Sequence, residues 1–348
     1  MGKKIHFKNF IGVVLRVTIG SVLAYVLILY TLRSTGTDLW IEILNSNKSL
    51  LSVALLLYGV IICVTIYRWD LLLRVQGLHL GGWDVVHLSM VGNFFNLALP
   101  GSVSGDIVKM SFVTRQTSQK KAEAMLTVLL DRVIGLSGLF VLAIIMMVYH
   151  LPFLVSLKQE FRAIQISALF VGLGGIAGIC IIVLLEMRRS LMKVEWIGRV
   201  VHYGTQILPD FLNSIVFRLL NALELYRRYR STTLRAVGLS ILVHICLALD
   251  LFIIGASFGE KMIRLEDYFL LVSVSNAVAA LPVTPGGIGT RDAMMVMFLI
   301  AMGPQGGRFG AIPVTMTLII LFWGLIGGIS FALLKNPRSQ VLLERPQV

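Results

Sequence analysis

Two short segments of the chain carry residue types that could bind an anion. Each has a Pro-Gly pair, a further glycine, and then an acidic and a basic residue: Pro100, Gly101, Gly105, Asp106 and Lys109 in the first, and Pro285, Gly286, Gly287, Gly289, Arg291 and Asp292 in the second. A helix N-terminus offers unpaired N–H groups and partial positive charge, and glycine lets an anion approach the backbone. Two such turns, each with a cation, would suit a phosphate-sized anion. Alternatively, proline and glycine merely mark kinks, since both are frequent in membrane helices.

Three further ionisable residues lie inside apolar runs, where such groups are costly and are candidates for function. Asp131 and Arg132 are adjacent, and they could serve a site or simply neutralise neighbouring helices. Asp250 has no base within one helical turn. It must therefore find a partner elsewhere, with Lys109, Arg132 and Arg291 as the options, or take up a proton, or face a wet cavity. We expect a role facing the site.

The composition limits the classes of protein that these residues can belong to. Of the 348 residues, 57% are hydrophobic and 14% charged, against about 45–50% and 25% in soluble domains. A single water-soluble core could not bury this apolar excess. The net charge of +13 would fit a nucleic-acid binder or a membrane protein with one basic side, and the hydrophobicity excludes the first. The cysteines are isolated in apolar runs, so neither disulfides nor a metal site is indicated.

The chain therefore reads as an all-α polytopic membrane protein. A transmembrane helix needs about 20 mostly apolar residues. Six stretches qualify: 13–32, 50–67, 130–149, 164–186, 236–258 and 310–334. Two more apolar regions, 84–114 and 268–302, are each interrupted by the proline- and glycine-containing segments described above. Broken backbone at membrane depth survives only against protein or a wet cavity, so we expect two re-entrant helical hairpins.

The distribution of lysine and arginine predicts the orientation. Basic residues at the N-terminus place it in the cytoplasm by the positive-inside rule. Basic residues flank 84–114 on both sides, which predicts that this hairpin enters from the cytoplasm, whereas the flanks of 268–302 predict entry from outside. An amphipathic segment at 194–230 is expected to lie on the cytoplasmic leaflet, and the basic C-terminus is expected to be cytoplasmic. We expect a plasma (inner) membrane protein.

This topology predicts two inverted repeats. The first, residues 1–160, contains the cytoplasmic hairpin, and the second, residues 161–348, contains the amphipathic segment and the external hairpin. Inverted repeats with discontinuous helices that meet near the midplane are typical of transporters, and the broken segments indicate the binding site.

Three motifs resemble one known family. LPGSVSGDIVKM, LLDRVIGL and PVTPGGIGTRDAMM are similar to segments of the flippase-like family, which comprises the transmembrane domain of lysylphosphatidylglycerol synthases (multi-peptide resistance factors) and stand-alone relatives. The resemblance covers nearly the whole chain. It implies inverted-repeat membrane proteins with re-entrant helices that move phospholipids or lipid-linked headgroups between leaflets, often as homodimers.

The resemblance also implies site residues. They are Asn93, Pro100, Gly105, Asp106, Lys109, Asp131, Arg132, Pro285, Gly286, Gly287, Gly289, Arg291 and Asp292. Two positions depart from the family pattern. Ser102 stands where a basic residue is common, and Lys109 stands where arginine is usual, which removes a fork-shaped phosphate contact. The chain ends at Val348 without a soluble aminoacyl-transfer domain, so lysine transfer to lipid is not expected.

We therefore expect a lipid translocase that shields a phosphate-bearing headgroup in a central cavity while the tails stay in lipid. Its partners would be a membrane phospholipid or a prenyl-phosphate-linked lipid, with a homodimer possible and no nucleic acid. No catalytic group, metal or cofactor is expected, because no enzyme fingerprint is present. Two alternatives stay open: a membrane enzyme or enzyme subunit that acts on lipid-linked sugars or phosphates, and an ion-coupled carrier of a small anion.

Overall fold

The chain is helical throughout the part that the structure describes. The computed structural model describes residues 38–99, 103–117, 120–191, 229–281, 284–303 and 309–333, with isolated positions between 22 and 36. Within these ranges there is no β-strand, which confirms the all-α class. The predicted span at 13–32 lies mostly outside the described residues, and so does nearly all of the predicted amphipathic segment at 194–230.

Five long helices form the body of the protein. They are α3 (Lys48–Val75), α6 (Lys121–Tyr149), α8 (Arg162–Leu191), α11 (Arg230–Ser257) and α14 (Ala311–Leu333). Each contains an apolar stretch long enough to cross a membrane, which confirms five predicted spans and a multi-pass membrane protein. Several helices are longer than predicted, and α6 begins at Lys121 rather than at 130. The reason is that an apolar window detects only the part inside the hydrocarbon, while the helix continues through polar residues beyond it.

Two pairs of shorter helices occupy the predicted broken regions. The first pair is α4 (Gly82–Ala98) and α5 (Ser104–Gln116), and the second is α12 (Leu265–Ala279) and α13 (Thr290–Met302) with the single turn η2 (Pro285–Gly287) between them. The longest, α4, measures about 25 Å at 1.5 Å per residue, less than the hydrocarbon thickness of about 30 Å. The predicted breaks are confirmed. That each pair enters and leaves the membrane from one face stays a prediction.

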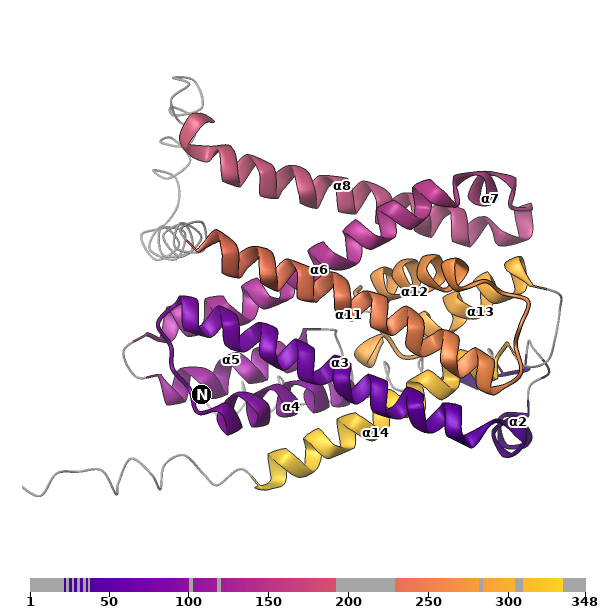
Figure 1. Cartoon of the computed structure of the whole chain (residues 1–348), viewed down its shortest axis with the longest axis horizontal. Helices are drawn as coiled ribbons and strands as arrows, with labels where there is room; N and C mark the ends of the chain where they lie inside the picture. The colour runs from indigo at the N-terminus through magenta and orange to yellow at the C-terminus, as the bar shows by residue number, and fades with distance from the viewer. Residues whose placement is uncertain are drawn as a thin grey trace, which may run out of the picture.

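Short elements connect the long helices. α2 (Leu39–Asn45) precedes α3, and α7 (Leu151–Ser156) and η1 (Gln159–Phe161) join α6 to α8. At one end of the bundle the N–H of Asn47, the N-cap of α3, donates to the carbonyl of Ser257, the last residue of α11, at 2.8 Å. The start of α3 therefore lies against the end of α11, and these two neighbouring helices run antiparallel (Figure 1).

The two short pairs approach the middle of the molecule from opposite ends of the bundle (Figure 1). The turn between α12 and α13 reaches the end of α4. A Cβ atom at Gly286 would lie 2.9 Å from Leu97 Cδ2 and 3.4 Å from the carbonyl oxygen of Asn96. Gly286 also has a positive φ of 58°, so glycine is required there by both space and conformation. The turn between α12 and α13 is thus in contact with the C-terminal end of α4.

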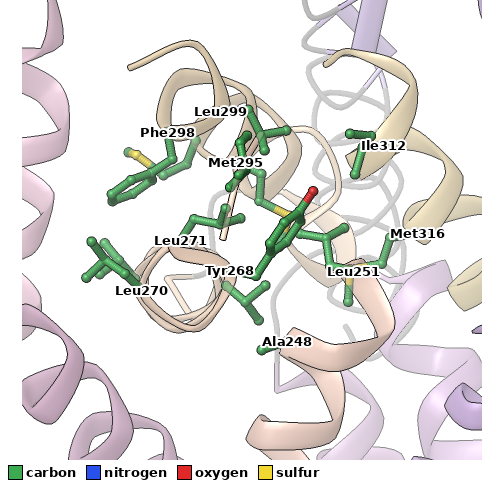
Figure 2. Close-up of a cluster of buried hydrophobic side chains, with 14 of the residues drawn as sticks. Ala248, Leu251, Tyr268, Leu270, Leu271, Met295, Phe298, Leu299, Ile312 and Met316 are labelled. Atoms are coloured by element: carbon green, nitrogen blue, oxygen red, sulfur yellow. The ribbon is translucent and has the colours of Figure 1, made fainter. Parts of the chain in front are cut away.

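The largest buried apolar cluster joins the second short pair to α11 and α14. Leu251, Tyr268, Leu271, Met295 and Met316 are nearly inaccessible to solvent and pack between these helices (Figure 2). Buried apolar area of this kind, together with close packing, holds helices in fixed positions. The second pair is therefore anchored along its length.

The outer surface of the bundle is apolar as well. Large apolar side chains stand exposed on several helices, including Leu56 on α3, Phe170 on α8 and Leu325 on α14, which are 67%, 74% and 64% exposed. Apolar surface of this extent is unfavourable in water. It suits contact with lipid tails, in agreement with the membrane assignment.

The order of elements repeats. A long helix, a short pair and a long helix occur as α3, α4 with α5, and α6, and again as α11, α12 with α13, and α14. The division into repeats at 1–160 and 161–348, and their inverted relation across a membrane, stay predictions.

Candidate functional site: a cationic cavity between the hairpin tips

A cavity of about 370 Å³ lies where the two short pairs meet the long helices. Side chains from α3, α4, α5, α6, α11, α12, α13 and α14 line it. Its polar and charged lining residues are Tyr58, Thr65, Arg68, Ser89, Asn93, Asn96, Asp106, Lys109, Asp131, Arg132, His244, Asn276 and Arg291. Segments more than 200 residues apart in the sequence therefore contribute to one polar chamber within an apolar bundle.

About half of the predicted site residues line this cavity. These are Asn93, Asp106, Lys109, Asp131, Arg132, Gly286 and Arg291. Others lie behind the lining, in or beside the hairpin turns: Gly105, Pro285, Gly287, Gly289 and Asp292. Pro100 and Gly101 are outside the described residues. The structure thus brings the predicted cations of both motifs to one chamber.

Arg291 is held rigidly at the second tip. Its Nε and Nη2 donate to Asp292 Oδ1 at 3.2 and 3.0 Å, and Nη2 also donates to Thr317 on α14. The Thr317 hydroxyl lies 2.9 and 2.8 Å from the two oxygens of Asp292. Asp292 and Thr317 are at most 1% exposed. The guanidinium is therefore fixed by a buried network, and its Nη1 makes no hydrogen bond to the described residues.

Asp292 also closes the turn before α13. Its Oδ2 accepts from the N–H of Gly289 at 3.2 Å. A carboxylate at this position is stabilised by the partial positive charge at the N-terminus of α13. In the first pair, Asn96 Oδ1 accepts from the N–H of Gly105 at 2.9 Å, so a side chain of α4 satisfies an amide in the first turn of α5. The amides of Gly105 and Gly289 are therefore occupied within the protein. Charged side chains, rather than these two amides, face the cavity.

Lys109 on α5 is placed differently from Arg291. It is 7% exposed, and its Nζ lies 3.5 Å from the centre of the Trp69 ring. Trp69 is in turn fixed by its Nε1–H, which donates to the Thr127 hydroxyl at 3.3 Å. Among the described residues no acceptor or carboxylate is bonded to Lys109. The ammonium is thus held by a cation–π contact and retains its hydrogen-bond donors for a ligand.

Two acid–base contacts complete the charged wall. Arg68 Nε donates to Asp131 Oδ1 at 2.8 Å, and Arg132 Nε lies 3.7 Å from Asp106 Oδ2. Arg68 and Asp131 are largely buried, whereas Arg132 is one-third exposed. Asp131 and Arg132 therefore point to different partners although they are neighbours in the sequence, and each neutralises a residue from another helix.

The charged lining has a positive excess. Four cations face the cavity, Arg68, Lys109, Arg132 and Arg291, against the two carboxylates Asp106 and Asp131, an excess of two charges. Counting Asp292, which lies behind Arg291, leaves an excess of one. Such a chamber favours an anion, because its field is not cancelled by the protein itself.

Asp250 is not a lining residue. It is fully buried on α11, and neither carboxyl oxygen has a hydrogen-bond partner in the described part of the chain. Pairing with Lys109, Arg132 or Arg291, which was one of the options for Asp250, is not found among the described residues: Arg291 is bound to Asp292, Lys109 lies over Trp69, and Arg132 is directed to Asp106. Helix packing directs each of these cations to a nearer group.

Sequence reasoning assigned no site role to several lining residues. Arg68, one of the basic residues that precede 84–114, lines the cavity and pairs with Asp131 across 63 positions. No local pattern could have indicated that pairing. Tyr58 and Trp323 also line the chamber from α3 and α14. Their aromatic type inside apolar runs is not distinctive, so only the packing of the helices identifies them.

Comparison with known proteins places the chain in a family. A family model described as the lysylphosphatidylglycerol synthase transmembrane region matches residues 13–328. A UPF0104 membrane protein from Pyrococcus horikoshii is 24% identical over 344 residues, which cover 92% of this chain and 97% of that protein. A UPF0104 membrane protein from Methanocaldococcus jannaschii is 22% identical over 296 residues, 80% of this chain and 83% of that protein. The resemblance predicted from three motifs is thereby confirmed: the chain belongs to the lysylphosphatidylglycerol synthase transmembrane family.

Proposed function

We propose that the protein is a lipid translocase that carries the phosphate-bearing headgroup of a phospholipid or a prenyl-phosphate lipid through the cavity between its hairpin tips. The observation that carries the proposal is the cation excess of that cavity, with Lys109 and Arg291 brought from opposite halves of the chain. The family relationship supports a role in the membrane and with lipid. In this proposal the protein moves its substrate without changing it chemically.

The size of the chamber fits a headgroup better than a whole lipid. Ligand cavities commonly measure about 300–1,000 Å³, and this one is near the lower end at about 370 Å³. A phosphate with a small substituent could enter, whereas the tails would stay among the apolar side chains and lipid outside. Separating the two parts in this way lets a charged group cross without exposure to hydrocarbon.

The two main cations would act differently on a bound phosphate. Arg291 is fixed by Asp292 and Thr317 and offers as a preoriented donor its Nη1, which makes no hydrogen bond to the described residues. Lys109 would exchange its contact with Trp69 for a charge-assisted hydrogen bond to a phosphate oxygen. Arg291 would position the headgroup, and Lys109 could keep its contact with the phosphate as the headgroup moves.

For a lipid to pass, the hairpins must provide access from both faces of the membrane. We propose that α4 with α5 forms the cytoplasmic re-entrant hairpin and α12 with α13 the external one, in an inner membrane with cytoplasmic termini. The contact between Gly286 and Leu97 supports this arrangement, because it brings the tips together. Small relative movement of the two tips would then open the cavity to one side or the other.

The test is a transbilayer assay in liposomes with fluorescent phosphatidylglycerol and, separately, a labelled prenyl phosphate. The wild-type protein should move at least one of them. Lys109→Met should abolish most of the lipid movement. Arg291→Met combined with Asp292→Asn should do the same, because the double change removes both charges of the buried pair. Arg115→Met is the matched control, because Arg115 lies exposed on α5 outside the cavity.

Three results would contradict the proposal. The first is no movement of any labelled lipid by folded protein, and the second is full activity in the two site variants. The third is chemical conversion of the lipid detected by mass spectrometry, which would favour a membrane enzyme. Uptake of a small soluble anion without any lipid movement would instead favour an anion carrier.

A further inference from the structure

A buried acid close to the cavity has no partner among the residues that the structure describes. Asp250 lies one helical turn after Leu247, which lines the cavity. The side chain of Asp250 is fully buried, and both carboxyl oxygens lack hydrogen-bond partners. Buried carboxylates are normally paired or hydrogen-bonded, because an isolated charge is costly away from water. Asp250 therefore needs a ligand that the described residues do not provide.

The helices around Asp250 offer no charge to neutralise it. α14 has no titratable residue in its described range, and α6 has none between Arg132 and Tyr149. The titratable residue that α3 contributes is Tyr58. On α11 itself, the titratable residue nearest to Asp250 in the sequence is Cys246, one turn earlier. On α12, Tyr268 packs against Gly255 and donates its hydroxyl to Glu260 at 3.2 Å. The smallest cation that could neutralise Asp250 without a cage of ligands is a proton.

Asp250 lies beside the cationic cavity. Leu247, one turn before it on α11, lines the same chamber as Arg291, and so does Tyr58 on α3, the helix that packs against α11. An ionised Asp250 would weaken the positive field that Arg291 presents, and a protonated Asp250 would leave that field intact. In a low-dielectric interior such effects act over longer distances than in water.

We propose that Asp250 binds a proton and that this proton and the anionic headgroup bind cooperatively. The inference rests on the proposed function. Protonation turns the carboxylate into a neutral carboxylic acid, so the cavity gains net positive charge and holds an anion more tightly. By linkage, a bound anion then favours protonation of Asp250 to the same degree. A proton gradient would in this way drive headgroup movement in one direction.

The first experiment measures the proton without any transport. Infrared difference spectra of the purified protein in detergent should show the C=O stretch of a protonated carboxylic acid that disappears as the pH is raised. Asp250→Asn should remove this band, and Asp250→Glu should restore a shifted one. Asp267→Asn, a change in the first turn of α12 away from the cavity, should leave the band in place. An unchanged band in Asp250→Asn would overturn the proposal.

The second experiment measures coupling in liposomes that contain fluorescent phosphatidylglycerol. In wild-type protein an imposed pH gradient should accelerate labelled-lipid movement in one direction, and in Asp250→Asn this acceleration should be lost completely while movement without a gradient persists. Asp250→Glu should keep the response. Lipid movement in wild-type protein that ignores the pH gradient would overturn the proton proposal and leave the translocase proposal standing. Absence of any lipid movement would contradict the translocase proposal, while the infrared result still decides proton binding.

Sodium provides the remaining alternative. The hydroxyls of Ser275 on α12 and Thr315 on α14 are also buried, with no hydrogen-bond partner among the residues described, and both helices pack against α11. Sodium is a hard cation, and such ions are bound by several oxygen ligands, so a sodium site would depend on these hydroxyls. A response to a sodium gradient rather than a pH gradient, lost in Ser275→Ala with Thr315→Val, would overturn proton binding at Asp250.

Discussion

The two hairpins carry the same sequence pattern but hold their cations in different ways. Arg291 in the second hairpin is bound to Asp292 and Thr317 in a fully buried network. Lys109 in the first hairpin rests on the face of Trp69, with no ion pair among the described residues. The acid of the first motif, Asp106, lies 3.7 Å from Arg132 instead. A shared motif has therefore produced one fixed cation and one adjustable cation.

This difference follows from the spacing of acid and base. In the second motif the base precedes the acid directly, so Asp292 can cap α13 and bind the guanidinium at once. In the first motif Lys109 follows Asp106 by three positions, and its side chain turns toward α3. We infer that the second hairpin holds its cation in a fixed position, whereas the cation of the first hairpin can change its contacts when a ligand binds. Four predictions test that division.

The largest expected effect is on the stability of the second hairpin. Asp292→Asn leaves Arg291 as a buried charge without a counterion, and breaking a buried pair in this way costs about 3–5 kcal/mol. The corresponding change in the first hairpin, Asp106→Asn, should cost under about 1 kcal/mol, because the pair with Arg132 is long and partly exposed. Chemical unfolding in detergent, followed by tryptophan fluorescence, measures both. Equal losses would remove the distinction between the hairpins.

The next effect concerns function at the adjustable cation. Lys109→Met should reduce lipid movement about tenfold or more, because a hydrogen bond to a charged group contributes about 1.5–3 kcal/mol and about 1.4 kcal/mol is a factor of ten. Stability should stay the same or rise, since methionine still packs on Trp69 and a buried charge is removed. Arg115→Met is the control for both measurements. A large loss of stability in Lys109→Met would show that this cation is structural too.

The same contrast explains what could be predicted from the sequence. The spans at 50–67 and 236–258 and the two breaks depend on local composition, and a window of about 20 apolar residues detects them. The gathering of Lys109 and Arg291 at one cavity was expected from the repeated motif. These features need no knowledge of which helix faces which, so the sequence was sufficient for them.

Pairings across helices could not be predicted. Arg68 with Asp131 and Arg291 with Thr317 depend on the rotation of each helix about its axis, which no single segment specifies. The packing role of Gly105 could not be predicted for the same reason. It allows contact between α4 and α5, since a Cβ there would lie 1.9 Å from the carbonyl oxygen of Gly92. A glycine in a predicted binding motif can thus serve helix packing, and the sequence alone does not distinguish this from ligand binding.

A third prediction compares glycines in the two hairpins. Gly105→Ala forces α4 and α5 apart, and Gly287→Ala brings a Cβ within 2.5 Å of the Ala279 Cβ at a φ of +71°. Overpacking costs about 1–3 kcal/mol, and the backbone strain should make Gly287→Ala the more damaging change. Gly238→Ala on α11 is the control, because nothing lies within 4 Å of the new atom. Unfolding in detergent would measure all three, and a harmless Gly287→Ala would contradict a rigid second tip.

The smallest expected effect tests whether the second tip is stabilised beyond the Asp292 network. The Thr290 hydroxyl donates to the carbonyl of Gly287 at 3.0 Å and lies 3.2 Å from the hydroxyl of Thr284. Thr290→Val should lower the free energy of unfolding by about 1 kcal/mol, the usual net contribution of such a bond. Thr114→Val in the first hairpin is the matched control. Its hydroxyl bonds only carbonyls of its own helix, Met110 and Ser111, so its loss should be near zero. Both changes exchange the same atoms. A loss of unfolding free energy confined to Thr290→Val would show that the second hairpin is stabilised by more than Asp292. Equal losses in the two variants would show no such additional stabilisation.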